Sequence, residues 1–477
     1  MTLSPMSSAS SNAEVTATDT TARGPLLLLI GVALLWLFVS GVMALLTSIQ
    51  LVKPTFFAEC PVFSYGRAEA MQESAFIYGW AANAGLAIAL WVLGRLGGAP
   101  LRGLNLVVVG TLFWNVALVL GLVGIVTGGA TSVAFLQLPG YVQPIMLVAY
   151  AAIGVAGVLA WLDRRNACTF AAQWYAVAAL FLFPWLFSAA QVMLIWSPVR
   201  GTLQAVAGGW FAQGSWTLWL APLALAGAYY VVPKIRGRVL PSYDFAPHAF
   251  WCLLVLGAFT GGRHLIGGPV PAWVASVAIV SCSLLLFHYF VVLLNLRGAF
   301  AGGGTALQLV AFGLAAYMLG GLVDAITAYR SVALVTQFTH FDAAQQQLAL
   351  YGGFSLIILG CIYYAVPRLT GRAWASSGLA TGHRVTVTLG VAGLVISLAM
   401  AGWLQGHDLN DPKISFAEIA THTRPWLLAV VAAQGLLLGA NLLLMVNFGM
   451  SVCACYLATP ADQTPFRQPS TMEASAS

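Results

Sequence analysis

Long apolar runs alternate with short polar turns along almost the whole chain. Each run has roughly the 20 residues that an α-helix needs to cross the hydrocarbon core of a membrane. The pattern therefore predicts an all-α, polytopic membrane fold with about twelve transmembrane helices. The predicted spans, numbered one to twelve in chain order, are 25–50, 75–97, 103–128, 140–162, 170–196, 209–233, 246–266, 270–295, 304–327, 345–367, 384–405 and 425–455.

Composition leads to the same class. Hydrophobic residues make up 60% of the 477 residues, and charged residues make up only 7%. Ordinary globular domains carry about 25% charged residues, so a soluble fold cannot hide this much apolar surface. We therefore expect a chain surrounded by membrane lipid, and we assign the net charge of +6 to its loops rather than to a nucleic-acid partner.

The two ends of the chain differ from the apolar body. Residues 1–23 are rich in Ser, Thr and Ala and contain a single basic residue, Arg23. They lack the basic start of a cleaved signal, so we expect a disordered cytoplasmic lead-in and a retained first span. Residues 458–477 are polar and contain three prolines, which also predicts disorder. Between them, residues 24–457 form the predicted twelve-helix membrane domain.

Basic residues are distributed unequally between the two sides of the membrane. With twelve spans, both termini lie on one side, and that side has Arg95, Arg102, Arg164, Arg165, Lys234, Arg236, Arg238, Arg297, Arg368, Arg372 and Arg384. The other side has Lys53, Arg67, Arg200, Arg263, Arg330, Lys413 and Arg424, and most of the acidic residues. Because basic loops stay in the cytoplasm, we expect a multi-pass protein of a bacterial-type inner (plasma) membrane with both termini cytoplasmic.

Few ionisable side chains lie inside the predicted spans, and each is a functional candidate because burying a charge in lipid is costly. The main ones are His288 and Asp324. Asp324 lies six residues before Arg330, too far for a pair on adjacent turns, so it has no predicted partner in its own helix.

Charged residues at two span ends have ordinary structural explanations. Arg263 and His264 follow Gly261-Gly262 at the end of span seven, where an Arg usually extends to the lipid headgroups. Glu73 lies at the entrance of span two, where a charge usually marks the water interface.

Seven scattered cysteines form no CxxC or CxxCH motif, which excludes a zinc ribbon and a covalent c-type haem.

Three consecutive amides, Gln345, Gln346 and Gln347, stand at the mouth of span ten. An α-helix turns about 100° per residue, so two residues are separated by about 200°. Gln345 and Gln347 are therefore expected to point to opposite sides of one helix and to serve two separate sites.

Several motifs in order resemble one family over most of the chain, the catalytic subunit I of haem-copper oxygen reductases. The resemblance is to the cbb3-type cytochrome c oxidases, with the large subunit of nitric oxide reductases as a relative. Its motifs are Ser64-Tyr65-Gly66-Arg67, Tyr229-Tyr230-Val231-Val232-Pro233-Lys234, Gly237-Arg238, Ser242-Tyr243, Pro271-Ala272-Trp273 and Tyr363-Tyr364-Ala365-Val366-Pro367-Arg368-Leu369. The resemblance implies twelve spans, two b-type haems, one copper ion, and partner subunits that carry cytochrome c.

The family's metals are held by six histidines, and we place those positions by the flanking motifs. The two positions that hold one haem between them fall on Gln72, just before span two, and on Gln347 in span ten, and the position that binds the other haem falls on Gln345. The copper-ligand positions fall on Gln213 in span six and on Arg263 and His264 after span seven. Five of the six histidines are thus replaced, and predicted spans two, six and ten contain no His at all. The family's redox-active tyrosine falls near Gly257, and its glutamate on helix nine falls near Val323.

These substitutions change the expected chemistry. A glutamine oxygen is a weaker and harder donor than imidazole, so it loses most of the affinity for haem iron. Arg263 would place a fixed cation beside the copper ion. We therefore expect no catalytic residues and no bound haem or copper, in a scaffold that keeps the family's fold.

Three functions stay open. The first is a redox-inactive or accessory relative within a respiratory complex. The second is an active terminal oxidase that reduces oxygen with electrons from cytochrome c and pumps protons. The third is a small-molecule or ion pathway through the vacated cavities, lined by Glu73, Asp324, Arg330 and the three glutamines.

Overall fold

The computed structural model describes residues 8–57, 59–165 and 168–457, and these residues form helices and connecting turns without any β-strand. The α-helices are α1 (Ser8–Val52), α2 (Tyr65–Ser74), α3 (Ala82–Gly97), α4 (Leu104–Val126), α5 (Gln143–Leu162), α6 (Ala171–Gln191), α7 (Thr202–Gly214), α8 (Ala221–Arg236), α9 (Ala246–Gly257), α10 (Ala272–Leu284), α11 (Leu286–Leu296), α12 (Thr305–Thr327), α13 (Arg330–Thr336), α14 (His340–Gln347), α15 (Leu356–Thr370), α16 (Ser377–Leu409) and α17 (Phe416–Leu457). Four π-helical segments are η2 (Ala75–Ala81), η3 (Val192–Trp196), η4 (Ser215–Leu220) and η8 (Leu348–Ser355). Short 3₁₀ turns are η1 (Pro61–Phe63), η5 (Tyr243–Phe245), η6 (Thr260–Leu265) and η7 (Arg297–Phe300).

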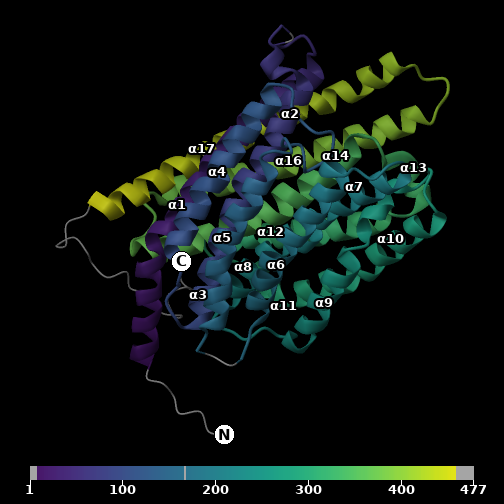
Figure 1. Cartoon of the computed structure of the whole chain (residues 1–477). Coiled ribbons are helices and arrows are strands. Elements are labelled where there is room, and N and C mark those ends of the chain that lie inside the picture. Colours follow the sequence, from purple (N-terminus) through teal and green to yellow (C-terminus); the bar gives the residue numbers. More distant parts are fainter. Residues whose placement is uncertain (1–7, 58, 166–167, 458–477) are drawn as a thin grey trace.

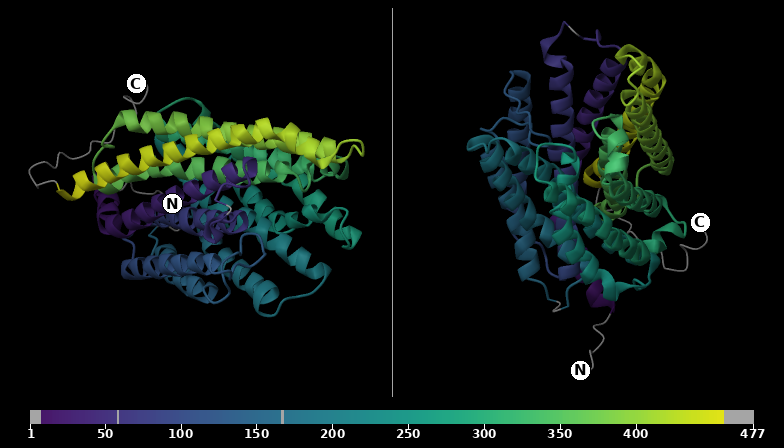
Figure 2. Two further views of the ribbon diagram at one scale, coloured as in Figure 1. Left: turned by 90° about the horizontal axis from the view of Figure 1, so that it is seen from above. Right: turned by 90° about the vertical axis from the view of Figure 1, so that its right-hand side faces the viewer.

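Joined across the π and 3₁₀ segments, these elements give twelve helices in the described residues that are long and apolar enough to cross a membrane. The prediction of about twelve spans and an all-α fold is confirmed. The helices form one bundle in which the long α17 lies along α16 and α1 on the outside (Figures 1 and 2).

Spans two, six and ten are the inner helices of this bundle. In their most apolar stretches 100%, 83% and 89% of the residues are buried, against 39–50% in the other nine spans. Glycines let the three inner spans touch. A Cβ at Gly85 would lie 2.8 Å from Leu223 of span six, and one at Gly227 would lie 2.6 Å from the sulfur of Cys361 of span ten. Small residues allow this close approach where lipid supplies no hydrophobic driving force.

Each inner span also changes from α to π geometry near a predicted metal-ligand position. The π segments η2, η4 and η8 begin shortly after Gln72, Gln213 and Gln347, respectively. A π segment inside an α-helix often accompanies a functional site. The inner spans therefore combine deep burial with local irregularity at one end.

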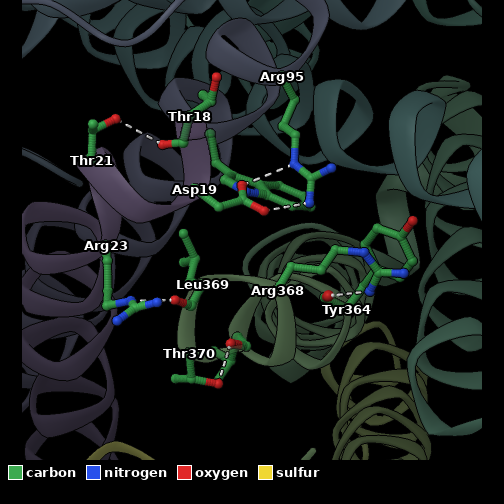
Figure 3. A network of polar contacts seen from close by, with 11 residues as sticks. Thr18, Asp19, Thr21, Arg23, Arg95, Tyr364, Arg368, Leu369 and Thr370 are labelled. Carbon is green, nitrogen blue, oxygen red and sulfur yellow. Dashed lines mark hydrogen bonds and ion pairs between the residues drawn. The ribbon is translucent and has the colours of Figure 1, made fainter. Parts of the chain in front are cut away.

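The start of the chain differs from the sequence prediction. Helix α1 already begins at Ser8, so the predicted disorder of residues 1–23 is wrong for residues 8–23. Asp19 accepts hydrogen bonds from Arg95 at 2.9 and 2.7 Å (Figure 3). It also accepts one from Trp91 at 3.1 Å. Composition alone does not reveal such a partner on a distant helix. The predicted disorder of residues 1–7 and 458–477 lies outside the described residues.

Candidate functional site

A cavity of about 180 Å³, here called the central cavity, lies where the inner spans meet the ends of spans seven and nine. Four of the six predicted metal-ligand positions line it: Gln213, Arg263, His264 and Gln345. The other polar residues of its wall are Glu73, Asp324, Asp342 and Gln346, and its apolar residues include Phe135, Trp216 and Leu350. Gln72 and Gln347 are not among the described residues that line it.

Arg263 and Asp324 form a buried ion pair in the wall of this cavity. Their Nη1 and Oδ1 atoms are 3.0 Å apart, and the two side chains are only 7% and 18% exposed. Arg263 also donates to the Thr327 hydroxyl at 3.3 Å. The expectation that Arg263 extends to the headgroups is therefore wrong, because a carboxylate from another span holds it inside the protein. Asp324 has a partner after all, and that partner lies outside its own helix.

Gln345 belongs to the same cluster. Its Nε2 donates to the Thr327 hydroxyl at 2.8 Å and to Asp324 Oδ1 at 3.3 Å. Both amide hydrogens thus have acceptors, and the amide satisfies oxygens that would otherwise be buried without donors. We call Arg263, Asp324, Thr327 and Gln345 the arginine cluster.

Glu73 also lies in the cavity wall and is partly buried rather than exposed to water. Its Oε1 accepts from Gln346 Nε2 at 2.9 Å, and its Oε2 accepts from the Phe135 backbone N–H at 3.4 Å. Phe135 has φ +61°, a left-handed conformation that non-glycine residues seldom adopt. Tyr78 also donates to the Phe135 carbonyl. Two side chains of span two therefore hold Phe135 at the cavity wall: Glu73 binds its backbone N–H and Tyr78 binds its backbone carbonyl.

The second predicted haem position, between Gln72 and Gln347, has a different structure. Ser40 donates to the Gln72 carbonyl at 3.1 Å, and the Gln72 amide lies 3.5 Å from the Ser40 hydroxyl. Four residues further along each span, the rings of Phe76 and Tyr351 touch, with centroids 5.5 Å apart. Tyr351 also donates to Asn441 Oδ1 at 3.0 Å. The two spans thus contact each other through an aromatic pair about one helical turn beyond Gln72 and Gln347.

The start of span ten differs from the sequence prediction. Span ten begins at His340 rather than at residue 345, so the statement that it contains no His is wrong at its first residue. His340 is not among the described residues that line the central cavity, and its backbone N–H donates to Gln405 at 2.9 Å.

Sequence reasoning also missed Thr327, Asp342 and Phe135, for which no local motif gave a signal. The described residues contain no group of three or more His, Cys, Asp or Glu suited to a metal ion.

Known proteins share this architecture. The family model described as "Cytochrome C and Quinol oxidase polypeptide I" matches residues 25–436. A "Cytochrome c oxidase subunit 1 homolog" of Azorhizobium caulinodans is 22% identical over 88% of this chain and 80% of its own length. A nitric oxide reductase chain of Stutzerimonas stutzeri is 26% identical over 44% of this chain and 47% of its own length. The solved structure of a heme-copper terminal oxidase dimer matches with a TM-score of 0.73 and 14% identity, covering 94% of this chain and 86% of that one.

Proposed function

The chain belongs to the cytochrome c and quinol oxidase polypeptide I family, and from this premise we propose that it is a redox-inactive member of the cbb3 type. It is a membrane protein of bacterial type with the fold of haem-copper oxidase subunit I. Its role in this proposal is that of an accessory subunit in a respiratory complex. The expected partners are oxidase subunits that carry cytochrome c, and the uneven distribution of Lys and Arg favours cytoplasmic termini.

The arginine cluster carries the proposal. At the predicted copper position stands a guanidinium, paired with Asp324 at 3.0 Å. An arginine stays protonated in proteins and offers no lone pair to a metal. Gln213, at another of the three predicted copper positions, offers only an amide oxygen, which is a harder and weaker donor than imidazole. The residues present do not fit a copper centre of the three-imidazole type.

The predicted haem positions support the same conclusion. Glutamine amides stand where the family's two haems would need imidazoles, and an amide is a weak ligand for haem iron. The contact between Phe76 and Tyr351 further disfavours a flat macrocycle between spans two and ten. In this proposal, the chain therefore carries no electron from cytochrome c to oxygen.

Metal analysis of the purified protein tests the proposal. This chain and a catalytically active subunit I of the same family are expressed in parallel cultures of the same host, so that the supply of haem and copper is equal. Each protein is then purified separately. We expect haem and copper far below one per chain, and no b-type signal in a reduced-minus-oxidised spectrum. One or two b-type haems per chain would refute the proposal and revive the alternative of an active, proton-pumping terminal oxidase, which oxygen consumption by the reconstituted complex would then establish.

The central cavity favours a second candidate, a pathway for a small molecule or ion. The cavity is lined by Glu73, Asp324, Gln345 and Gln346, which the pathway hypothesis names. Arg330 and Gln347, which it also names, are not among the described lining residues. Glu73→Gln is the informative variant, because it removes a charge without breaking the arginine cluster. Unchanged fluxes of protons, sodium and ammonium in proteoliposomes of this variant and the parent chain would count against the pathway.

A further inference from the structure

A second cavity, here called the basic cavity, lies at the other end of spans two and six. It measures about 550 Å³ and is lined by residues of four segments. These are the end of α3 at Leu96, the start of α6 at Phe170–Ala172, the end of α8 at Tyr229–Lys234, and the loop Gly237–Tyr243. Its wall is mainly apolar and aromatic, with two cationic side chains, Lys234 and Arg238.

Hydrogen bonds hold the loop of this cavity at both ends. Gly237 ends α8 in the left-handed conformation with φ +59°, which turns the chain back. Just before it, Arg236 donates to the Gly298 carbonyl at 2.7 Å and also to the Gly302 carbonyl. At the far end, the Tyr243 hydroxyl accepts from the Ala171 N–H at 2.7 Å. The loop is therefore a preformed wall of the cavity.

The two cations of the basic cavity are uncompensated. Lys234 and Arg238 are exposed, and neither makes an ion pair within the described part of the chain. Lys234 lies over the Tyr230 ring at 6.0 Å. Asp244 adjoins the loop but is exposed and lies outside the lining. The cavity thus presents two positive charges at its polar rim.

The ion pair of Arg95 and Asp19 behind the cavity leaves this excess unchanged. The Tyr230 ring packs on Trp91, with centroids 5.2 Å apart. Behind it, Arg95 is neutralised by Asp19 in the contact drawn in Figure 3, so this pair adds no net charge. Any anion that approaches the basic cavity therefore meets the field of Lys234 and Arg238.

Apolar side chains at the mouth point to the nature of the ligand. Val239, next to Arg238, is 91% exposed, and Phe170 is 41% exposed. Both are lining residues that leave apolar surface uncovered beside a cationic rim. A ligand that covers both must be amphiphilic, with an anionic head and an apolar body.

We propose that the basic cavity binds an anionic glycerophospholipid, with its phosphate at Lys234 and Arg238 and part of an acyl chain along the apolar wall. This end of the bundle has most of the chain's Lys and Arg residues, and anionic lipids gather where basic residues meet a membrane surface. A soluble phosphate compound would leave the apolar wall uncovered, and a neutral lipid would leave the two cations unpaired. The proposal requires no metal and so is independent of the redox state of the chain.

Thermal unfolding of the full chain in detergent, after lipid removal, tests this proposal. Phosphatidylglycerol is expected to raise the unfolding temperature in a saturable way, whereas phosphatidylcholine, inorganic phosphate and ATP are not. In Lys234→Gln/Arg238→Gln the apparent affinity for phosphatidylglycerol should fall by about tenfold or more, since each basic residue near an anionic surface contributes about 1 kcal/mol. The matched control Arg297→Gln/Arg384→Gln removes the same charge from the same end, at residues outside the cavity lining that form no ion pair within the described residues, and should leave the affinity unchanged.

A second variant tests the contact with the acyl chain separately from the contact with the phosphate. Val239→Ser changes a side chain with almost no buried surface, so the fold is preserved, and it should weaken phosphatidylglycerol binding by about threefold through lost apolar contact. Equal stabilisation by phosphatidylcholine would refute the proposal, as would equal losses in the cavity variant and its control. Stabilisation by inorganic phosphate or ATP as strong as that by the lipid would identify a soluble anion site instead and would also overturn it.

Discussion

Around Arg263 the inner spans enclose a polar cavity of about 180 Å³, whereas near Gln72 and Gln347 the same spans are packed ring against ring. Glutamines stand at predicted ligand positions in both regions, so the substitution to glutamine does not decide which structure results. The difference lies in the charged side chains. The first region contains the arginine cluster and Glu73, and the second has neutral neighbours.

Buried charges explain why one region stays open. An ion pair in a low-dielectric interior requires further hydrogen bonds around it, and Thr327 and Gln345 supply them. Such a network occupies fixed positions and resists collapse. Apolar and aromatic side chains have no such requirement, so they close the space between spans two and ten by contact. A vacated cofactor region is therefore expected to survive as a cavity where charge is retained.

Restoring the histidines should give the largest effect and the sharpest form of this comparison. Gln213→His/Arg263→His adds two imidazoles to His264 in one existing cavity, and three imidazoles suit copper. We expect copper to rise from a trace to about one per chain. Gln72→His/Gln347→His should not raise the haem content, because the Phe76–Tyr351 contact stays in place. Elemental analysis and pyridine haemochrome spectra measure both quantities.

Gln213→Leu/Arg263→Leu is the control for the copper variant, because it removes the guanidinium without adding a ligand. Copper uptake by this control would show that removing the charge is sufficient. The opposite result would be haem uptake by Gln72→His/Gln347→His and no copper in Gln213→His/Arg263→His. It would show that the region near Gln72 and Gln347, and not the central cavity, can still accept its cofactor.

The next effect concerns stability. Asp324→Asn keeps the side-chain shape but leaves the Arg263 charge buried without its partner, which costs about 3–5 kcal/mol. The matched control is Asp163→Asn, since Asp163 pairs with Arg102 at 3.2 Å where the two side chains are 29% and 68% exposed. Breaking that exposed pair should cost no more than about 1 kcal/mol. Equilibrium unfolding in mixed micelles compares the two variants.

A rescue distinguishes loss of the partner from local damage. Arg263→Met/Asp324→Leu removes both charges, and well-packed apolar replacements of a buried pair are often neutral in stability. Recovery of most of the lost stability is expected. If Asp324→Asn and Asp163→Asn have equal effects, the arginine cluster does not hold the central cavity in the way described.

The sequence predicted those features that depend on local composition. Apolar runs of membrane length gave the twelve spans, and motifs in matching order gave the family. The pairing of Arg263 with Asp324 was missed because the two residues lie on different spans with no local signal of contact. The same reason applies to Asp19, whose partner Arg95 lies on a distant helix, and to Phe76 and Tyr351, which look like ordinary apolar residues of a span.

Helical geometry gave part of the candidate site. Gln345 and Gln347 were predicted to serve different spaces, and in the structure Gln345 lines the central cavity while Gln347 is not among its described lining residues. Gln346 was assigned to no metal-ligand position and was predicted only to line the pathway, and in the structure it donates to Glu73 in the wall of the same cavity. The assignment of these positions as former metal-ligand sites stays a prediction, and the restored histidines test it.

The smallest expected effect concerns the closed region. Tyr351→Phe keeps the ring contact with Phe76 and removes only the hydroxyl that donates to Asn441. Because that leaves a buried amide oxygen without its donor, we expect a loss of about 1 kcal/mol. A double-mutant cycle with Asn441→Ala isolates the hydrogen bond from the packing. If the loss equals that of Asp324→Asn, a polar bond rather than ring packing holds spans two and ten together, and the contrast between a charged, open region and a neutral, closed one fails.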